Sequence, residues 1–458
     1  MIEQVVPVVV AEVPNVGSGL DGLFQQSEVF IEIGFDTDVL GVGVRLIGIT
    51  FYECLEERER LLSVSLEPIR VPGLDQQLLS LRQAIEAAPD VGHLRNDLGY
   101  FLLYHGRYAE ALRQFEKYAE LSPGEANPMD SLAEAYLYTG QAETALEKYA
   151  AILEVDPTFG VSHSGRAWSF AVLGRYDEAL GEWEKLLKAE NPSFSPTDIL
   201  FLEAFTLSRV GRYVDARAKI ARSRELLAKN PAPDAEAFLH LLSAAQSLEL
   251  GQYSECIDGA RRARQVMPQV ATAIHQDTLM LAVELWEGVA EARRGNLNAA
   301  RGLLDALAEV YDAEVEWETW FYEALRGEMA LAANELDVAE SAFLRAEPEF
   351  KMLFGNGFPL VSVFSNHTPG RDGLARVKKA QGDLAGAIRI YRGLLTADMG
   401  SKWVAMLEPR YVLELARLLD ESGDKEAARA EYERFLELWK DADEGLPELK
   451  EARAYVAE

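Results

Sequence analysis

Residues 89–122 read PDVGHLRNDLGYFLLYHGRYAEALRQFEKYAELS, and the next two stretches of the chain repeat its landmarks in the same register. Prolines stand at positions 89, 123 and 157, glycines at 106, 140 and 174, and alanines at 111, 145 and 179, so each landmark recurs every 34 residues (123 − 89). Aromatic residues occupy the matching positions 115, 149 and 183. Agreement of four landmarks over three stretches predicts a solenoid built from one repeated structural unit.

Each landmark suits a pair of packed helices. Gly106 can end a first helix because glycine adopts the left-handed backbone conformation without steric cost. The stretch GRYAEA at 106–111 then places an acidic residue in the first turn of a second helix, where the helix dipole favours negative charge. Small residues at 99, 133 and 167 allow the helices to approach closely, and the proline closes the second helix. The unit is therefore predicted to be a helix–turn–helix pair.

The pattern continues with looser spacing after the third unit. Six further turns occur at Gly211, Gly251, Gly295, Asn334, Gly382 and Gly423, spaced by 37 to 48 residues (211 − 174 and 382 − 334), and all but the one at Gly251 are followed by the alanine. Asparagine at 334 fits because it also tolerates the left-handed conformation. Residues 74–89 are interpreted as the second helix of a degenerate preceding pair, with Leu81 and Ile85 facing inward. The sequence thus predicts an all-α fold, a right-handed α-solenoid of about nine helix pairs.

These landmarks resemble the tetratricopeptide repeat, and the resemblance covers roughly residues 74 to 440. It implies a helical solenoid over 71–440 that binds other proteins and has no enzymatic activity. The tail from Tyr432 to Val456 also resembles the tetratricopeptide modules of bacterial regulatory and kinase-associated proteins, although this chain lacks a kinase signature. Residues 441–458 are predicted to form a capping helix, with Leu449 and Ala452 on its apolar side.

Two segments depart from the repeat. Residues 1–70 are rich in β-branched residues and predict a small β-rich segment, for which a cap on the solenoid and a docking surface both remain open. The step from Asn334 to Gly382 contains an insertion, and we interpret residues 347–370 either as a loop on a binding face or as part of an extended first helix.

Composition excludes several classes of partner. The 75 acidic and 45 basic residues give a formal charge of −30, which disfavours nucleic acid and membrane surfaces and favours basic or neutral partners. No secretory signal or membrane span is recognised, so we expect a cytoplasmic protein. Cys256 is expected to be an inert core residue, and Cys54 is too distant from it for a metal site. Oligomeric state cannot be read from the sequence.

No catalytic or cofactor pattern is present. The six histidines form no HExxH motif and no metal-binding spacing with cysteine, and the serines lack a GxSxG elbow. The abundant carboxylates are typical of a solvated face in so acidic a chain. We therefore expect no catalytic residue, no metal and no cofactor, and we predict that the protein is not an enzyme.

The first helix of each pair lines the concave face of such a solenoid, so its outward stripe is the candidate peptide-binding groove. Reading that stripe in register gives Asn96, Tyr100, Tyr104, Asp130, Glu134, Tyr138, Ser164, Trp168, Phe201, Phe205 and Arg209. The stripe is aromatic and acidic, which favours a protein or peptide with basic and apolar side chains. The other interpretation is that these aromatic residues only fill the seams between neighbouring pairs.

Two functions remain open from the sequence. The leading hypothesis is a scaffold or adaptor that binds proteins through the concave face. The alternative is a regulatory or sensor subunit that binds a small ligand or a peptide and gates a separate catalytic partner. Both use the same groove and differ in the size of the ligand.

Overall fold

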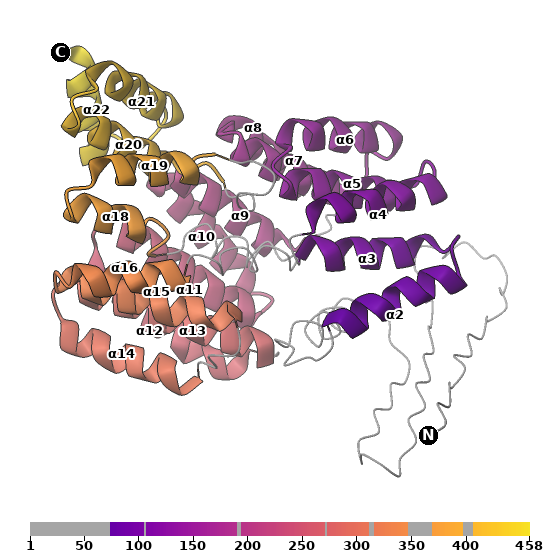
Figure 1. Ribbon diagram of the computed structural model, residues 1–458, viewed down its shortest axis with the longest axis horizontal. Helices are drawn as coiled ribbons and strands as arrows, with labels where there is room; N and C mark the ends of the chain where they lie inside the picture. Colours follow the sequence, from indigo (N-terminus) through magenta and orange to yellow (C-terminus); the bar gives the residue numbers. More distant parts are fainter. Residues whose placement is uncertain are drawn as a thin grey trace, which may run out of the picture. The chain divides into compact units, whose positions relative to one another are not determined.

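The structure is a computed structural model that describes residues 74–104, 107–189, 194–270, 273–310, 316–346, 369–396 and 406–458 (Figure 1). All of these residues belong to Arg70–Glu458, the second of two units into which the chain divides. The predicted β-rich segment 1–70 lies outside the described residues. So does most of the predicted 347–370 loop, of which only Pro369 and Gly370 are described, as a turn.

The described residues form helices and contain no strand, as the repeat pattern predicted. A helix α2, Leu74–Ala87, precedes nine helix pairs. The first five pairs are α3 Gly92–Tyr104 with α4 Tyr108–Leu121, α5 Ala126–Tyr138 with α6 Ala142–Val155, α7 Gly160–Val172 with α8 Tyr176–Lys188, α9 Pro196–Arg209 with α10 Tyr213–Leu227, and α11 Pro233–Glu249 with α12 Tyr253–Val266. A short 3₁₀ helix, η1 Met267–Gln269, follows α12.

The later pairs have the looser spacing that the sequence showed. They are α13 Ala273–Arg293 with α14 Leu297–Val310, α15 Glu316–Ala332 with α16 Leu336–Ala346, α18 Gly373–Ala380 with α19 Leu384–Leu394, and α20 Pro409–Glu421 with α21 Lys425–Leu438. A last helix, α22 Pro447–Ala457, ends the chain. The α-solenoid of nine helix pairs is thus confirmed in the described residues.

From the second pair to the ninth, the turn within each pair has the left-handed geometry that glycine permits. In the second pair Gly140 has φ of 81°, and the N–H of Gln141 donates to the carbonyl of Tyr136 at 2.9 Å. Gly140 itself donates to Leu137 at 3.0 Å, which completes a Schellman motif. Asn334, with φ of 60°, is the one non-glycine residue with a left-handed backbone among those described. The predicted role of asparagine at this turn is confirmed.

Aromatic rings occupy the space that small residues leave on the facing helix, as the repeat pattern predicted. A methyl group added at Gly99 would lie 2.8 Å from the ring of Phe115, and one added at Gly165 would lie 2.1 Å from the ring of Tyr149. Both rings are almost fully buried. Burial of one such side chain contributes roughly 1.5 to 3 kcal/mol, so the close approach of the helices is a main source of stability.

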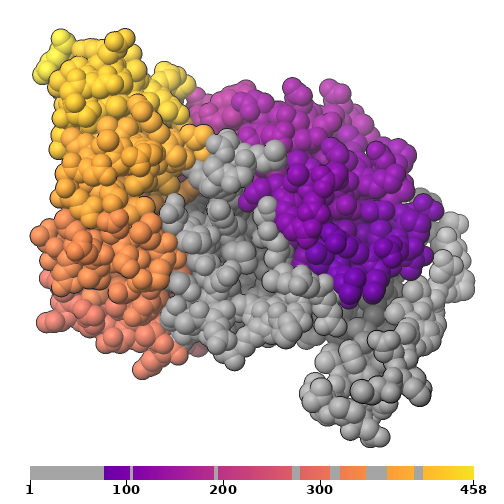
Figure 2. Space-filling view, in the orientation of Figure 1, coloured from indigo at the N-terminus to yellow at the C-terminus, as the bar shows by residue number. Residues whose placement is uncertain are grey.

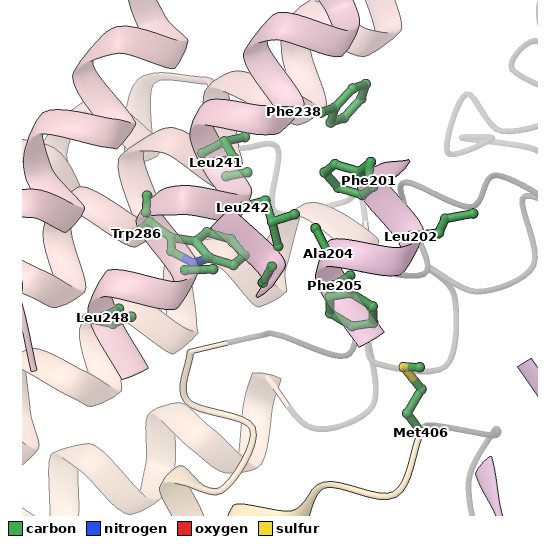
Figure 3. Packing of buried hydrophobic residues seen from close by; sticks show 14 of the residues in the cluster. Phe201, Leu202, Ala204, Phe205, Phe238, Leu241, Leu242, Leu248, Trp286 and Met406 are labelled. Carbon is green, nitrogen blue, oxygen red and sulfur yellow. The ribbon is translucent and has the colours of Figure 1, made fainter. Parts of the chain in front are cut away.

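Helices pack mainly on their neighbours in the chain. All of the extensive helix–helix contacts in the described residues join helices that are first or second neighbours in chain order, as Figure 1 shows for the pairs. One large hydrophobic cluster includes side chains from the second to the seventh pair and from the ninth pair, and Figure 3 shows part of it. Nearest-neighbour packing of this kind is what a repeat array requires.

The predicted last helix is present. Leu449 and Ala452 of α22 are buried, and Val456 packs on the same cluster from a partly exposed position. The apolar side that the sequence assigned to this helix therefore faces the protein. That residues 441–458 act as a cap on the array stays a prediction.

Candidate functional site: the first helices of the pairs

The candidate groove residues lie on the first helices α3, α5, α7 and α9, but they differ widely in exposure. Asn96, Tyr100, Glu134 and Tyr138 are half-buried, whereas Asp130, Ser164, Trp168, Phe201, Phe205 and Arg209 are buried. The structure places Tyr104 at the end of α3 and does not describe its side chain. The predicted stripe thus divides into a part on α3 and α5, whose described side chains are half-buried except for Asp130, and a buried part on α7 and α9.

The two phenylalanines of α9 belong to the core. Phe205 has no exposed surface and Phe201 has 2%. Phe201 meets Phe238 of α11 with the ring centroids 6.4 Å apart, and Figure 3 shows the α9 side chains within the packed cluster. Every residue from Leu200 to Arg209 is buried, so α9 is covered on all sides. The expectation that Phe201 and Phe205 face an open groove is corrected by this burial.

Arg209 is occupied within the chain. Its guanidinium forms ion pairs with Glu249 of α11 and with Glu408, which immediately precedes α20. Glu408 lies 199 residues along the chain from Arg209 (408 − 209). Sequence reasoning assigned Arg209 to a partner and missed Glu408, because the repeat period relates neighbouring pairs and carries no signal for a contact between the fourth and ninth pairs.

Trp168 fills the seam between the third and fourth pairs. Its ring meets Trp183 edge to face at 5.9 Å between centroids and lies 6.4 Å from Phe205. Only 9% of Trp168 is exposed, and Ser164 on the same helix is also buried. In this structure Trp168 lies in a seam between neighbouring pairs, the position that the alternative interpretation gave to the aromatic residues.

The part of the stripe on α3 and α5 combines half-buried side chains with the buried Asp130, and we call it the α3–α5 surface: Asn96, Tyr100, Asp130, Glu134 and Tyr138. The hydroxyl of Tyr100 donates a hydrogen bond to the carboxylate of Glu134, which joins the first two pairs. Tyr100 also packs edge to face on Phe115, with the ring centroids 4.9 Å apart. The side-chain oxygen of Asn96 is buried and has no hydrogen-bond partner among the described residues. The surface therefore combines half-exposed rings with unsatisfied polar capacity.

Asp130 forms the floor of the α3–α5 surface. It is 8% exposed, and the hydroxyl of Ser162 on α7 donates to its Oδ1 at 3.0 Å. Burial, with a smaller contribution from the negative charge of Glu134, raises the pKa of Asp130 to about 8, although the Ser162 bond acts in the opposite direction. At neutral pH its carboxyl group therefore carries a proton for most of the time. The sequence analysis did not identify Ser162; the candidate stripe contained Ser164, two positions later, instead.

Asp130 differs from the other buried acids of the described residues, because it alone among them has no basic partner. The others face lysine or arginine at short distances. Examples are Glu203 with Lys219 at 2.8 Å, Glu287 with Arg261 at 2.7 Å, Glu323 with Arg345 at 2.7 Å and Glu328 with Arg293 at 2.9 Å. A buried acid without a cation is energetically unfavourable, so this position requires an explanation other than stability.

The chemistry available at the α3–α5 surface is recognition. Its groups can accept hydrogen bonds, pair with a cation and stack on apolar side chains. Among the described residues no group of three or more histidine, cysteine or acidic side chains is arranged to hold a metal ion. None of the described helices combines the length and the apolar character that a membrane span requires. Cys256 is buried, and burial raises the pKa of its thiol to about 12, as expected for a core residue.

Comparison with known proteins identifies the repeat. The tetratricopeptide repeat family matches residues 78–126, 131–193 and 373–447. A search of curated proteins finds no match. Among solved structures, a tetratricopeptide repeat protein from Parabacteroides merdae is similar at 16% identity and a TM-score of 0.42, over 62% of this chain and 98% of the other. The type IV pilus biogenesis factor PilW is similar at 18% identity and a TM-score of 0.37, over 49% of this chain and 97% of PilW.

Proposed function

The chain is a tetratricopeptide-repeat protein, and we propose that it acts as a protein-binding scaffold that holds a basic, partly apolar segment of its partner on the α3–α5 surface. The observation that carries this proposal is Asp130, a buried acid without a basic partner in the described part of the chain. No catalytic role is proposed for any residue of this surface.

The carboxyl groups supply the preference for a basic partner. Glu134 is half-exposed and bonded to Tyr100, and no lysine, arginine or histidine of the described residues pairs with it or with Asp130. A lysine or arginine side chain placed between these two acids would offset their mutual repulsion and restore the charge of Asp130. The other buried acidic residues of the described chain already pair with basic side chains. A cation from a partner should therefore gain more binding free energy at this surface than at those residues.

The tyrosines supply the apolar contact. Tyr100 and Tyr138 are half-buried, so each ring has one face held by the protein and further surface open to a partner. Rings held in this way lose little conformational entropy when they bind. Asn96 is half-buried on the same helix as Tyr100, and its side-chain amide can donate and accept hydrogen bonds with the backbone of an extended segment. Together these groups favour an extended peptide with alternating basic and apolar residues.

A displayed library of random peptides, selected on the full-length protein, tests the proposal. We expect lysine and arginine next to apolar residues in the enriched peptides. Fluorescence anisotropy with one enriched peptide then compares Glu134→Gln with Glu147→Gln, which removes the same charge from an exposed position on α6. We expect Glu134→Gln to weaken binding roughly tenfold at low salt and Glu147→Gln to have little effect.

Protonation gives a second readout of the same site. The cation pairs with the ionised form of Asp130, so affinity for the peptide should rise as the pH is raised towards about 8 and then level off. Enrichment of acidic peptides, equal effects of the two glutamine variants, or an affinity independent of pH between 6 and 8 would each contradict the proposal.

A further inference from the structure

The ninth pair makes a contact that the repeat does not require. Its residues and the segment before it touch the third and fourth pairs, although these are far apart in the chain; Trp439 and Arg209, which share a hydrogen bond, are 230 residues apart (439 − 209). The extensive helix contacts elsewhere in the described residues join chain neighbours, whereas this contact is narrow and is confined to the ends of helices.

Met406, Leu407 and Glu408 form the first part of the contact. These residues are buried and precede α20 without being helical. The N–H of Leu407 donates to the carbonyl of Ala171 at the end of α7 at 3.2 Å, and its carbonyl accepts from the hydroxyl of Tyr176 at the start of α8. The end of α7 and the start of α8 thus bind the backbone of this segment.

The end of α21 forms the second part. The indole of Trp439 donates to the carbonyl of Arg209 at 2.9 Å, and the N–H of Asp443 donates to the carbonyl of Gly211 at 3.0 Å. The carboxylate of Asp443 accepts from the N–H of Val214 at 2.9 Å in the first turn of α10. Residues from the far end of the chain therefore satisfy backbone groups at the turn between α9 and α10 that a helix end leaves unpaired.

The surroundings of the turn glycines also show that the ninth pair covers the third and fourth turns. A methyl group added at Gly174 would lie 2.7 Å from Leu407, and one added at Gly211 would lie 2.8 Å from Ala442 and 3.0 Å from Trp439. At the equivalent turn position of the fifth pair, Gly251, nothing lies within 4 Å of such a group. The third and fourth turns are thus covered by the ninth pair, while the fifth turn is open.

The two arginines at the contact have partners on both sides of it, and Glu408, which pairs with Arg209 across the contact, also accepts from the N–H of Arg410 at 3.1 Å on its own side. Arg209 pairs with Glu408 across the contact and with Glu249 on its own side. Arg410 donates to the hydroxyl of Tyr213 across the contact at 3.0 Å and pairs with Glu448 of α22 on its own side at 2.8 Å. Separation would therefore leave neither arginine without a carboxylate, which removes the main penalty for opening a buried ion pair.

The ninth pair also has the means to stay folded when it separates. The extensive helix contacts of α20 are with α21 and α19, and those of α21 are with α20 and α22, and Figure 2 shows the end of the chain as a continuous yellow region. On another side, Leu415 and Leu418 of α20 share a separate hydrophobic cluster with Tyr391 of the eighth pair. The ninth pair can thus leave the third and fourth pairs and remain attached to the eighth.

We propose that the ninth pair together with α22 is a latch, which closes on the turns of the third and fourth pairs and opens as a unit while those pairs stay folded. Opening exposes Trp439 and returns Arg209 to solvent. Arg209 is the residue that the sequence placed on a partner-facing stripe, so the latch decides whether that end of the stripe is accessible. The proposal is independent of peptide binding at the α3–α5 surface.

Two matched glycine variants of the full-length chain test the latch. Gly211→Ala and Gly251→Ala carry a new methyl group at the same turn position with φ of 72° and 68°, so both suffer the same backbone strain, but only the first collides with the ninth pair. Hydrogen–deuterium exchange is measured by mass spectrometry. We expect amides of 406–414 and 436–446 to exchange at least about tenfold faster in Gly211→Ala than in Gly251→Ala, with 233–266 unchanged.

Asp443→Ala provides a milder opening, with Asp441→Ala as its control, because Asp441 is an exposed acid two positions earlier. We expect faster exchange at 208–216 in Asp443→Ala and not in Asp441→Ala. If Gly211→Ala does not fold, this pair of variants tests the latch in its place. Equal exchange within both variant pairs would overturn the latch. Loss of protection throughout 196–266 would overturn it as well, because the contact would then be part of the common core.

Discussion

A buried acidic residue has opposite electrostatic surroundings in the first two pairs and in the sixth to eighth pairs. In the first two pairs, where the 34-residue period is strict, Asp130 is buried beside Glu134 and receives one hydrogen bond from a serine. In the later pairs Glu328 is buried to a similar degree between Arg293 and Arg376. The two arginines lower the pKa of Glu328 to about 2 in spite of its burial, whereas the pKa of Asp130 is raised to about 8.

The difference separates a structural acid from a candidate binding acid. Glu328 on α15 links α13, which carries Arg293, to α18, which carries Arg376, so it holds three successive pairs together. Asp130 links its pair to the next through Ser162 alone, and its ionised form destabilises the folded state. Residues that cost stability and are nevertheless present are typical of functional sites. The comparison therefore supports our proposal that Glu328 serves stability and that Asp130 serves recognition.

The largest effect is expected for Glu328→Gln. This change removes the buried carboxylate that the half-buried Arg293 and Arg376 share, although Arg376 keeps Asp372, and we expect the free energy of unfolding to fall by about 3 to 5 kcal/mol. Urea denaturation followed by circular dichroism measures it. In the wild-type chain the stabilisation from Glu328 should be complete above about pH 4.5 and should disappear as the pH falls towards 2, because its folded pKa lies below the unfolded value of 4.5. If Glu328→Gln is as stable as the wild type, Glu328 does not stabilise the fold and the contrast with Asp130 is wrong.

Asp130→Asn should have a smaller effect of opposite sign. The amide keeps the shape of the side chain, can still accept from Ser162 and carries no charge, so we expect the unfolding free energy at pH 7 to rise by on the order of 1 to 3 kcal/mol. The folded pKa is above the unfolded value of 3.8, so the wild-type chain loses stability as the pH rises from about 4 to 8. The advantage of the variant should therefore vanish near pH 4. A destabilised variant would show that Asp130 is structural.

The smallest effect is expected for Glu340→Gln, a surface acid of the same later pairs. Glu340 pairs with Lys378 at 2.6 Å while both side chains remain partly exposed to water. Ion pairs of this kind contribute little because solvent screens them, so we expect a change below about 1 kcal/mol in the same denaturation experiment. A loss as large as that of Glu328→Gln would mean that burial is not the variable that separates these acids.

The repeated sequence by itself determined the fold of the described residues. The 34-residue period, the turn glycines and the asparagine at 334 predicted each of the nine pairs, because these features act within one pair or between neighbours. The close approach of Phe115 to Gly99 was readable for the same reason, since both lie in the first pair. Local backbone conformation and nearest-neighbour packing are properties that a periodic sequence carries in full.

The tertiary structure decided which parts of the predicted stripe are accessible. Periodicity places Phe201 and Arg209 on the outward side of their helix, but it cannot say whether a distant part of the chain covers that side. Arg209 is covered by Glu408, which precedes α20, and by Trp439 at the end of α21. Neither residue occupies a position of the repeat pattern that predicts this contact. The pairing of Asp130 with Ser162 likewise depended on the angle between the second and third pairs. Contacts of this kind follow from how the pairs stack in space, and that geometry is set by many small packing terms that no single residue encodes.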